Sequence, residues 1–247
     1  MSRAGKAPGE NLADSAGVPW SGRTLTAQPF PGDDGSCDPG LGAALAGGSL
    51  EEVVRAWAPT RALVPIVAVL GEGEEATASE GDKSADMALV TITGADGVRS
   101  LPVFTSVAAL AAWNPGARPV PVEAARAAQA AVLEECGQIV VDAAGPQLRI
   151  LPRPCVWAVA QGRDWVPPAA DPEVLTGVAN LARAVPDLVA HRVEPDGETG
   201  LLVVLGLPAG LDADAVQRVV QRLSELLAAD PVVAERAGSI RLSLRTA

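Results

Sequence analysis

Apolar, β-rich runs alternate along this chain with segments that begin at helix-capping residues, and this alternation restricts the fold more than any other feature. The run at 62–70 contains Pro65 and is therefore expected at a sheet edge, a strand start or a bulge. The runs at 87–93 and 98–104 flank a Gly-Ala-Asp-Gly turn, which predicts an antiparallel hairpin. Short strands combined with helices are typical of a mixed α+β architecture.

The same reasoning places helices between the runs. Predicted caps are Asp38 before Pro39, Ser49 with Glu52 as a capping box, and Thr105 for a short helix to about Ala112. An alanine-rich helix is predicted over 123–135, with Gly137 in the left-handed position that ends it. The runs at 139–141 and 148–151 predict another strand pair. Together these elements predict a mixed β-sheet with packed helices.

The last third of the chain repeats the pattern on a smaller scale. A helix is predicted from Asp171 and Pro172, followed by a hairpin of 189–193 with 201–205. Asp212 then caps a strongly amphipathic helix, Asp230-Pro231 starts another helical turn, and 240–244 alternates as a final strand. This α-β-β-α-β order predicts an open-faced sandwich, a small sheet that usually needs a neighbour or a partner at one exposed edge.

These patterns divide the chain into four parts. We predict a poorly ordered arm at 1–40, an N-terminal domain at 41–160, a proline-containing linker at 161–170 and a C-terminal domain at 171–247. Trp20 and Phe30 interrupt the polar composition of the arm, so the arm is expected to be pinned to the body there. Residues 71–86 hold six acids and are expected to form a solvated loop.

Charge and cysteine usage exclude several classes of protein. The formal charge of −11 is spread along the chain, so no segment supplies the basic face that nucleic acid requires. No apolar run approaches the roughly 18 residues of a membrane span, and the first residues lack the apolar stretch of a secretory signal. Cys37, Cys136 and Cys155 are odd in number and show no metal-ligand spacing, which predicts a reducing, cytoplasmic location.

The search for catalytic chemistry returns few candidates. His191 is the only histidine, which excludes multi-histidine metal sites and most catalytic triads, and no phosphate-cradling glycine loop occurs in the required context. We therefore expect no enzyme, no cofactor and no metal. The residues that remain as binding candidates are Asp33, Asp34, Phe104, Thr105, Ser106 and Trp113. The acids lack the alternating spacing of a calcium loop, and the two hydroxyls have no base nearby in sequence.

The order and spacing of several short motifs resemble a known family. In chain order these motifs are Phe30-Pro-Gly-Asp-Asp-Gly35, Leu63-Val-Pro65, Asp86-Met-Ala-Leu-Val90, Leu101-Pro-Val-Phe-Thr-Ser106 with Trp113, and Val120-Pro-Val122. Over roughly 28–160 they resemble the N-terminal domain of the SseB (enhanced serine sensitivity) family, of the type found in actinobacterial proteins, and 171–247 resembles the family's C-terminal domain. The resemblance implies an α+β fold, no established catalytic residues and a partner linked to translation.

Two functions are consistent with these observations. The first is a non-enzymatic interaction or regulatory protein that binds an unidentified protein partner, with self-association into a homo-oligomer also considered. The alternative is an enzyme or a binder of a small polar metabolite that uses the Asp33/Asp34 loop and Thr105/Ser106. A contiguous apolar surface around Trp113 would favour the first, and a deep pocket with convergent polar groups would favour the second.

Overall fold

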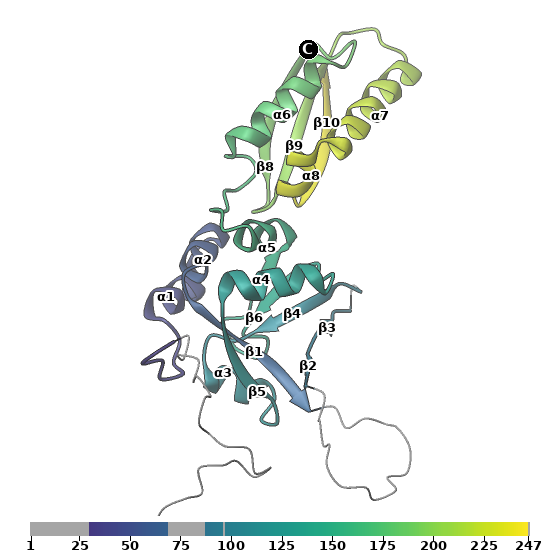
Figure 1. The fold of residues 1–247 in the computed structure, drawn as a ribbon. Coiled ribbons are helices and arrows are strands. Elements are labelled where there is room, and N and C mark those ends of the chain that lie inside the picture. Colours follow the sequence, from purple (N-terminus) through teal and green to yellow (C-terminus); the bar gives the residue numbers. More distant parts are fainter. Residues whose placement is uncertain (1–29, 69–86, 96, 247) are drawn as a thin grey trace, which may run out of the picture. The chain divides into compact units, whose positions relative to one another are not determined.

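The computed structural model describes residues 30–68, 87–95 and 97–246 (Figure 1). The predictions for the first 29 residues, including Trp20, and for the acidic segment 71–86 lie outside the described residues. The chain is α+β, as predicted, with helices and both parallel and antiparallel strand pairs. We describe an N-terminal lobe (33–166) and a C-terminal lobe (169–246) in turn. No helix within these ranges is both long and apolar enough to cross a bilayer.

The N-terminal lobe contains two sheets where the sequence predicts one. Its elements are α1 (Pro39–Gly47), α2 (Leu50–Trp57), β1 (Arg61–Ala68), β2 (Met87–Leu89), β3 (Ile92–Thr93), β4 (Arg99–Val103), α3 (Val107–Trp113), β5 (Arg118–Glu123), α4 (Ala124–Leu133), β6 (Gln138–Val141), β7 (Arg149–Pro152) and α5 (Arg153–Ala160). One sheet is antiparallel in the order β2-β1-β5, and the other has the order β3-β4-β6-β7 with β4 and β6 parallel (Figure 1).

The predicted hairpin is confirmed only at its turn end. Ile92 and Thr93 pair with β4 across the turn that Gly94 and Gly97 close, whereas Met87–Leu89 pairs with β1 in the other sheet. The run at 87–93 is thus shared between two sheets, because its first half has a second strand, β1, available as a long-range partner. β1 is the central strand of its sheet, so the predicted edge position of Pro65 is wrong. Pro65 is accommodated because it lies just before the stretch of β1 that pairs with β2, where only β5 is its strand partner.

Local capping agrees with the sequence at most helix starts. Asp38 caps α1, and Ser49 with Glu52 forms the capping box of α2. The predicted cap at Thr105 is wrong by one residue, since Ser106 accepts the hydrogen bond from the N–H of Ala109 at the start of α3. The left-handed residue after α4 is Glu135, at φ 55°, and not Gly137.

Helix α4 joins the two sheets of the lobe. Its buried side chains are Ala124, Ala127, Ala128 and Ala131, a stripe at helical spacing whose small size lets the helix approach closely. Through this stripe α4 contacts β1 and β5 of one sheet and β4 and β6 of the other. It also packs on α5, a helix that was not predicted from the sequence and that carries Pro154 in its first turn, where proline is tolerated.

The predicted linker contributes to the core of the N-terminal lobe. Trp165 is buried and belongs to the same apolar cluster as Trp57 and the alanines of α4. The aromatic side chain therefore fixes this part of the segment to the lobe that precedes it. Burying a Trp removes a large apolar area from water, a gain that a freely moving linker would forfeit.

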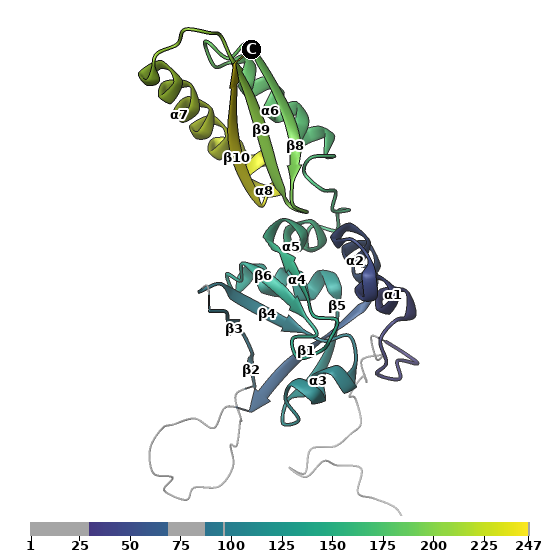
Figure 2. The ribbon, with the colours of Figure 1, turned by 180° about the vertical axis from the view of Figure 1, so that it is seen from behind.

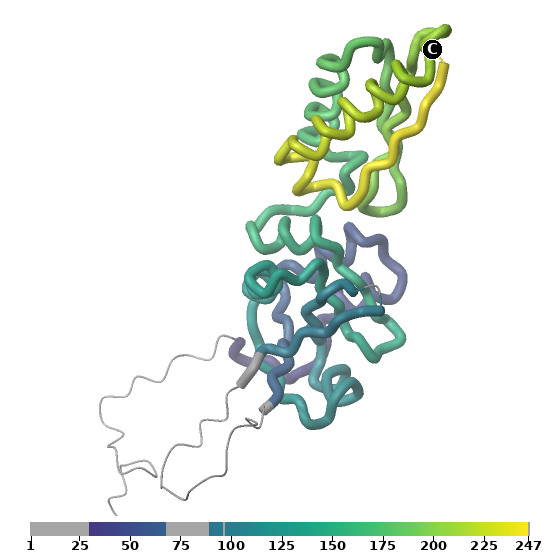
Figure 3. Tube along the Cα trace, turned by 90° about the vertical axis from the view of Figure 1, so that its right-hand side faces the viewer, coloured from purple at the N-terminus to yellow at the C-terminus, as the bar shows by residue number. Residues whose placement is uncertain are grey.

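The C-terminal lobe has the predicted open-faced arrangement. Its elements are α6 (Pro172–Arg183), β8 (Ala190–Asp196), β9 (Gly200–Leu207), α7 (Ala213–Ala229), α8 (Pro231–Arg236) and β10 (Ser239–Thr246). The sheet order is β10-β9-β8, with β8 and β9 antiparallel and β9 and β10 parallel. The three helices cover one face of the sheet, and Figures 2 and 3 show its strands from the uncovered side and after a quarter turn.

Candidate functional site

The segment that leads from β4 into α3 holds three of the predicted site residues, Phe104, Thr105 and Ser106. We call this segment the β4–α3 junction. Phe104 is fully buried, and its N–H and C=O each form a 2.9 Å hydrogen bond with the backbone of Leu63 in β1. This isolated bridge ties the two sheets together. Phe104 therefore belongs to the interior of the lobe.

The second junction residue, Thr105, is held by the buried carboxylate of Asp142. The N–H of Thr105 donates to Oδ1 of Asp142 at 2.9 Å, and its Oγ1 donates to Oδ2 at 2.7 Å. Asp142 follows β6 in the left-handed conformation, at φ 51°, and its own N–H donates to the carbonyl of Val103 at 2.9 Å. These contacts lock the carboxyl ends of the parallel strands β4 and β6 to each other. Both carboxylate oxygens of Asp142 therefore accept a hydrogen bond from Thr105.

Arg61 binds the predicted acidic loop to the same junction. Its Nε and Nη2 donate to the two oxygens of Asp33 at 2.5 and 2.9 Å, a bidentate geometry that the guanidinium group favours. The same guanidinium donates from Nη1 to the carbonyl of Thr105 and from Nη2 to that of Ser36, each at 2.6 Å. Arg61 thus holds the loop beside the junction, and its guanidinium group is already paired with the carboxylate of Asp33.

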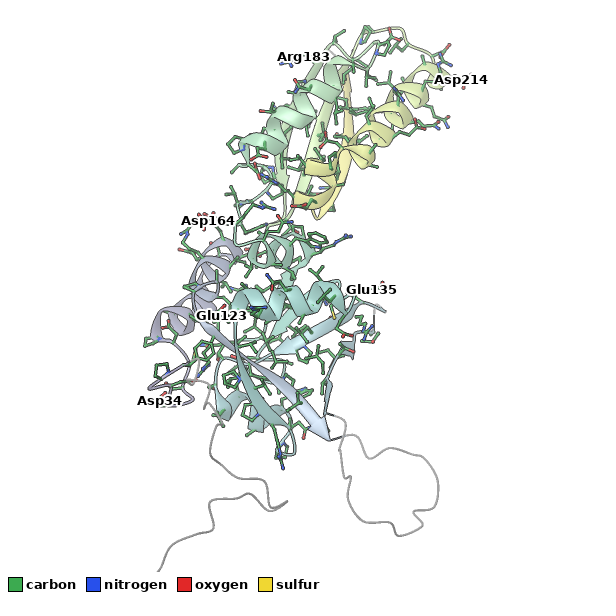
Figure 4. All side chains as sticks on the ribbon, viewed as in Figure 1. Asp34, Glu123, Glu135, Asp164, Arg183 and Asp214 are labelled. Carbon is green, nitrogen blue, oxygen red and sulfur yellow. The ribbon has the colours of Figure 1, made fainter. Side chains whose placement is uncertain are left out.

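The two acids of the loop differ in what they contact. The hydrogen bond from Arg61 lowers the pKa of Asp33, against a smaller opposing effect of burial. Asp34 lies at the surface (Figure 4) and accepts hydrogen bonds from the N–H and the hydroxyl of Ser36, which lower its pKa. Both carboxyls are thus held as anions within a turn, as expected for aspartates that stabilise loops.

Trp113, the last predicted site residue, lies at the rim of the lobe and stacks on the buried ring of Phe104. Its ring is tilted by 37° on that of Phe104, with centroids 5.2 Å apart, and it packs with a small apolar cluster that includes Leu63 and Leu110. The side chain is half-buried. An anchored aromatic with one accessible part is typical of residues that contact partners.

The Thr105 hydroxyl is buried. A threonine nucleophile must reach a substrate as well as a base, and Thr105 donates its hydroxyl proton into the interior, to the buried carboxylate of Asp142. His191, the sole histidine, is exposed in β8 of the other lobe. Among the residues that the structure describes, no cluster of three His, Cys, Asp or Glu side chains is arranged to hold a metal ion.

Two residues that organise the junction were not selected from the sequence. Asp142 lies in the turn predicted between the strands at 139–141 and 148–151, and Arg61 directly precedes the apolar run at 62–70. An aspartate directly after a buried strand is a detectable signal, because its short side chain tolerates the left-handed conformation and can bond to nearby backbone. Nothing local marks Arg61, whose partners lie 28 and 44 residues away.

The fold and the junction define an α+β protein in which all of the described polar candidates form hydrogen bonds within the chain. Residues 41–158 match the family model of the SseB protein N-terminal domain. The predicted resemblance to the SseB N-terminal domain is therefore confirmed over these residues, while the actinobacterial type and the resemblance of 171–247 to a C-terminal domain of that family stay predictions. No curated protein and no solved structure matches the chain.

Proposed function

We propose that this chain is a non-enzymatic interaction or regulatory protein of the SseB family that acts in the cytoplasm through contacts with another protein. The observation that supports this most directly is the hydrogen-bonding of the β4–α3 junction. The hydroxyl of Thr105 and both carboxylates, Asp33 and Asp142, are engaged inside the chain. The network holds the junction in one conformation and keeps the hydroxyl of Thr105 buried beside Asp142, out of reach of a substrate.

Trp113 is the proposed anchor of the partner surface. Its ring is held by Phe104 on one side, so little side-chain entropy is lost when a partner covers the other side. Large aromatic side chains with this combination of rigidity and exposure supply much of the binding energy of protein interfaces. The resemblance to the SseB family adds translation proteins as the first class of partner to look for.

A capture experiment with a matched control tests this function. Tagged full-length chain, Trp113→Ala and Leu133→Ala are used as baits in native lysate, followed by cross-linking and mass spectrometry. Leu133 on α4 is the control because it is a strongly exposed apolar side chain away from the junction, 83% accessible. We expect specific partners with wild type and Leu133→Ala, and their loss with Trp113→Ala. Equal capture by all three baits would refute the role of Trp113.

The alternative function is tested separately. A thermal-shift screen of the full chain with amino acids, nucleotides and divalent ions reports any small ligand that binds the folded state. We expect no compound to raise the melting temperature. A shift that disappears in Asp34→Ala would instead assign the exposed acidic loop as a metabolite or cation site.

A further inference from the structure

The three-stranded sheet of the C-terminal lobe ends in two edges of different character. Edge strands expose unpaired backbone groups, and proteins commonly protect them with proline. β8 carries Pro195, which removes one backbone donor from that strand. β10 is an eight-residue strand with no proline, and no strand among the described residues pairs with its outer side.

Side chains divide cleanly between the two faces of β10. Ile240 and Leu242 pack into the apolar core beneath the helices, and Leu244 follows them on that face but remains 43% exposed. Arg241, Ser243 and Arg245 alternate with them and therefore point to the uncovered face. The partly exposed apolar row reaches the unpaired edge, where an added strand would cover it.

From this pattern we infer that β10 pairs with β10 of a second copy of the same chain, antiparallel and centred on Leu242, to form a continuous six-stranded sheet. A two-fold axis at Leu242 places Leu242 opposite its own equivalent and Ile240 opposite Leu244. The uncovered face then sets Arg241 opposite Ser243. In this register every apolar residue of β10 lies opposite an apolar residue of the second copy. Each arginine lies opposite a serine, with Arg245 opposite Ser239.

Neighbouring registers are less favourable. Centring the pair on Arg241 opposes Arg241 to itself, and centring it on Ser243 opposes Arg241 to Arg245. Like charges placed directly across an antiparallel pair are destabilising. The register at Leu242 avoids both contacts and pairs all but the last residue of the strand, which makes a second copy the occupant that this edge fits best.

The covering helix is compatible in charge with such a pair. α7 lies on the helix-covered face of the sheet (Figures 1 and 2), and Ile240 and Leu242 pack into the same apolar core as its buried side chains, so a two-fold axis at Leu242 would bring the α7 helices of both copies toward each other. The exposed side of α7 carries Arg218, Arg222 and Glu225, and therefore charges of both signs. The net charge of −11 opposes association over longer distances, and physiological salt screens that repulsion beyond about 8 Å.

Ser243 provides a pair of charge variants that test the register. Sedimentation equilibrium of the full chain at 150 mM NaCl is compared for wild type, Ser243→Arg and Ser243→Glu, with circular dichroism as a check of folding. By symmetry each substitution creates two new contacts with Arg241. We expect Ser243→Arg to weaken the dimer about tenfold and Ser243→Glu to retain or strengthen it.

Cysteine cross-linking gives a second, independent readout. Leu242→Cys places two thiols opposite each other at the two-fold axis, so mild oxidation should yield a covalent dimer, whereas Ser239→Cys should not cross-link to itself. Cys37→Ser is used as the background because Cys136 and Cys155 are buried. A wild type that stays monomeric up to 100 μM, on the order of a weak dimer's Kd, would overturn the inference. So would a dimer in which both Ser243 variants associate equally, or one cross-linked only through Ser239→Cys.

Discussion

Replacing the buried Asp142 with alanine should destabilise the N-terminal lobe. The substitution removes the acceptor of two hydrogen bonds from Thr105, which is itself buried and has no access to water as a substitute. Each buried donor left without an acceptor costs about 1–3 kcal/mol. Alanine in the left-handed conformation of residue 142, at φ 51°, adds about 1 kcal/mol. We therefore expect a loss of about 3–7 kcal/mol.

Asp142→Asn is the matched control. Asparagine tolerates the left-handed conformation, its carbonyl can accept from the N–H of Thr105, and its amide can donate to the hydroxyl oxygen. The expected loss is about 1 kcal/mol. Thr105→Val removes only the hydroxyl and should fall between the two variants. Combined with Asp142→Ala it should add less than its separate effect, because both changes disrupt the same pair.

Urea unfolding followed by tryptophan fluorescence measures these differences. All five tryptophans lie at or before residue 165, so the C-terminal lobe is silent and the signal follows the N-terminal part of the chain. The midpoint should fall while the dependence on urea stays constant, as expected when stability changes and compactness does not. Equal midpoints for Asp142→Ala and Asp142→Asn would refute the structural role assigned to this carboxylate.

Three further predictions concern other parts of the chain. Arg61 lowers the pKa of Asp33, so the stability that wild type has over Asp33→Asn should be full at neutral pH and begin to fall near pH 4, the pKa of an unfolded aspartate. It should vanish only below the lowered pKa of the folded state, as measured by urea midpoints across pH. A thiol reagent at pH 8 should label one cysteine in the native chain and almost none in Cys37→Ser, because burial raises the pKa of the other two thiols. Gly200→Ala should destabilise the C-terminal lobe, because its Cβ would lie 2.3 Å from a backbone oxygen. Gly47→Ala has open space around it and should stabilise α1 by about 0.5–1 kcal/mol. Hydrogen exchange measures both effects, and unchanged protection of the C-terminal lobe in Gly200→Ala would contradict the packing.

Several residues at the β4–α3 junction could be selected from the sequence, whereas the contacts that they make could not. The sequence selected Asp33, Thr105 and Trp113, and the structure places all three on or beside the β4–α3 junction. What it could not supply was Arg61, which joins the loop to the junction. A residue's local context predicts caps and turns, whereas a bidentate contact across 28 residues depends on how distant segments meet.

Local signals determined most helix starts of this protein. Asp38, Ser49, Asp171, Asp212 and Asp230 all cap the helices predicted for them, because a cap satisfies backbone donors within three residues and needs no tertiary contact. The amphipathic pattern likewise determined which side of α7 is buried. These features are short-range and can be read directly from the sequence.

Tertiary structure decided how the strands were distributed. The run at 87–93 could pair with β4 or with β1, and it does both, because strand pairing is chosen by partners that are far apart in sequence. Helix α5 has Pro154 in its first turn, where proline is tolerated, and its apolar face packs on α4. Trp165 is buried in a segment composed like a linker. For the strands and for Trp165, the gain from burying apolar surface against distant segments exceeds the local preference of the chain.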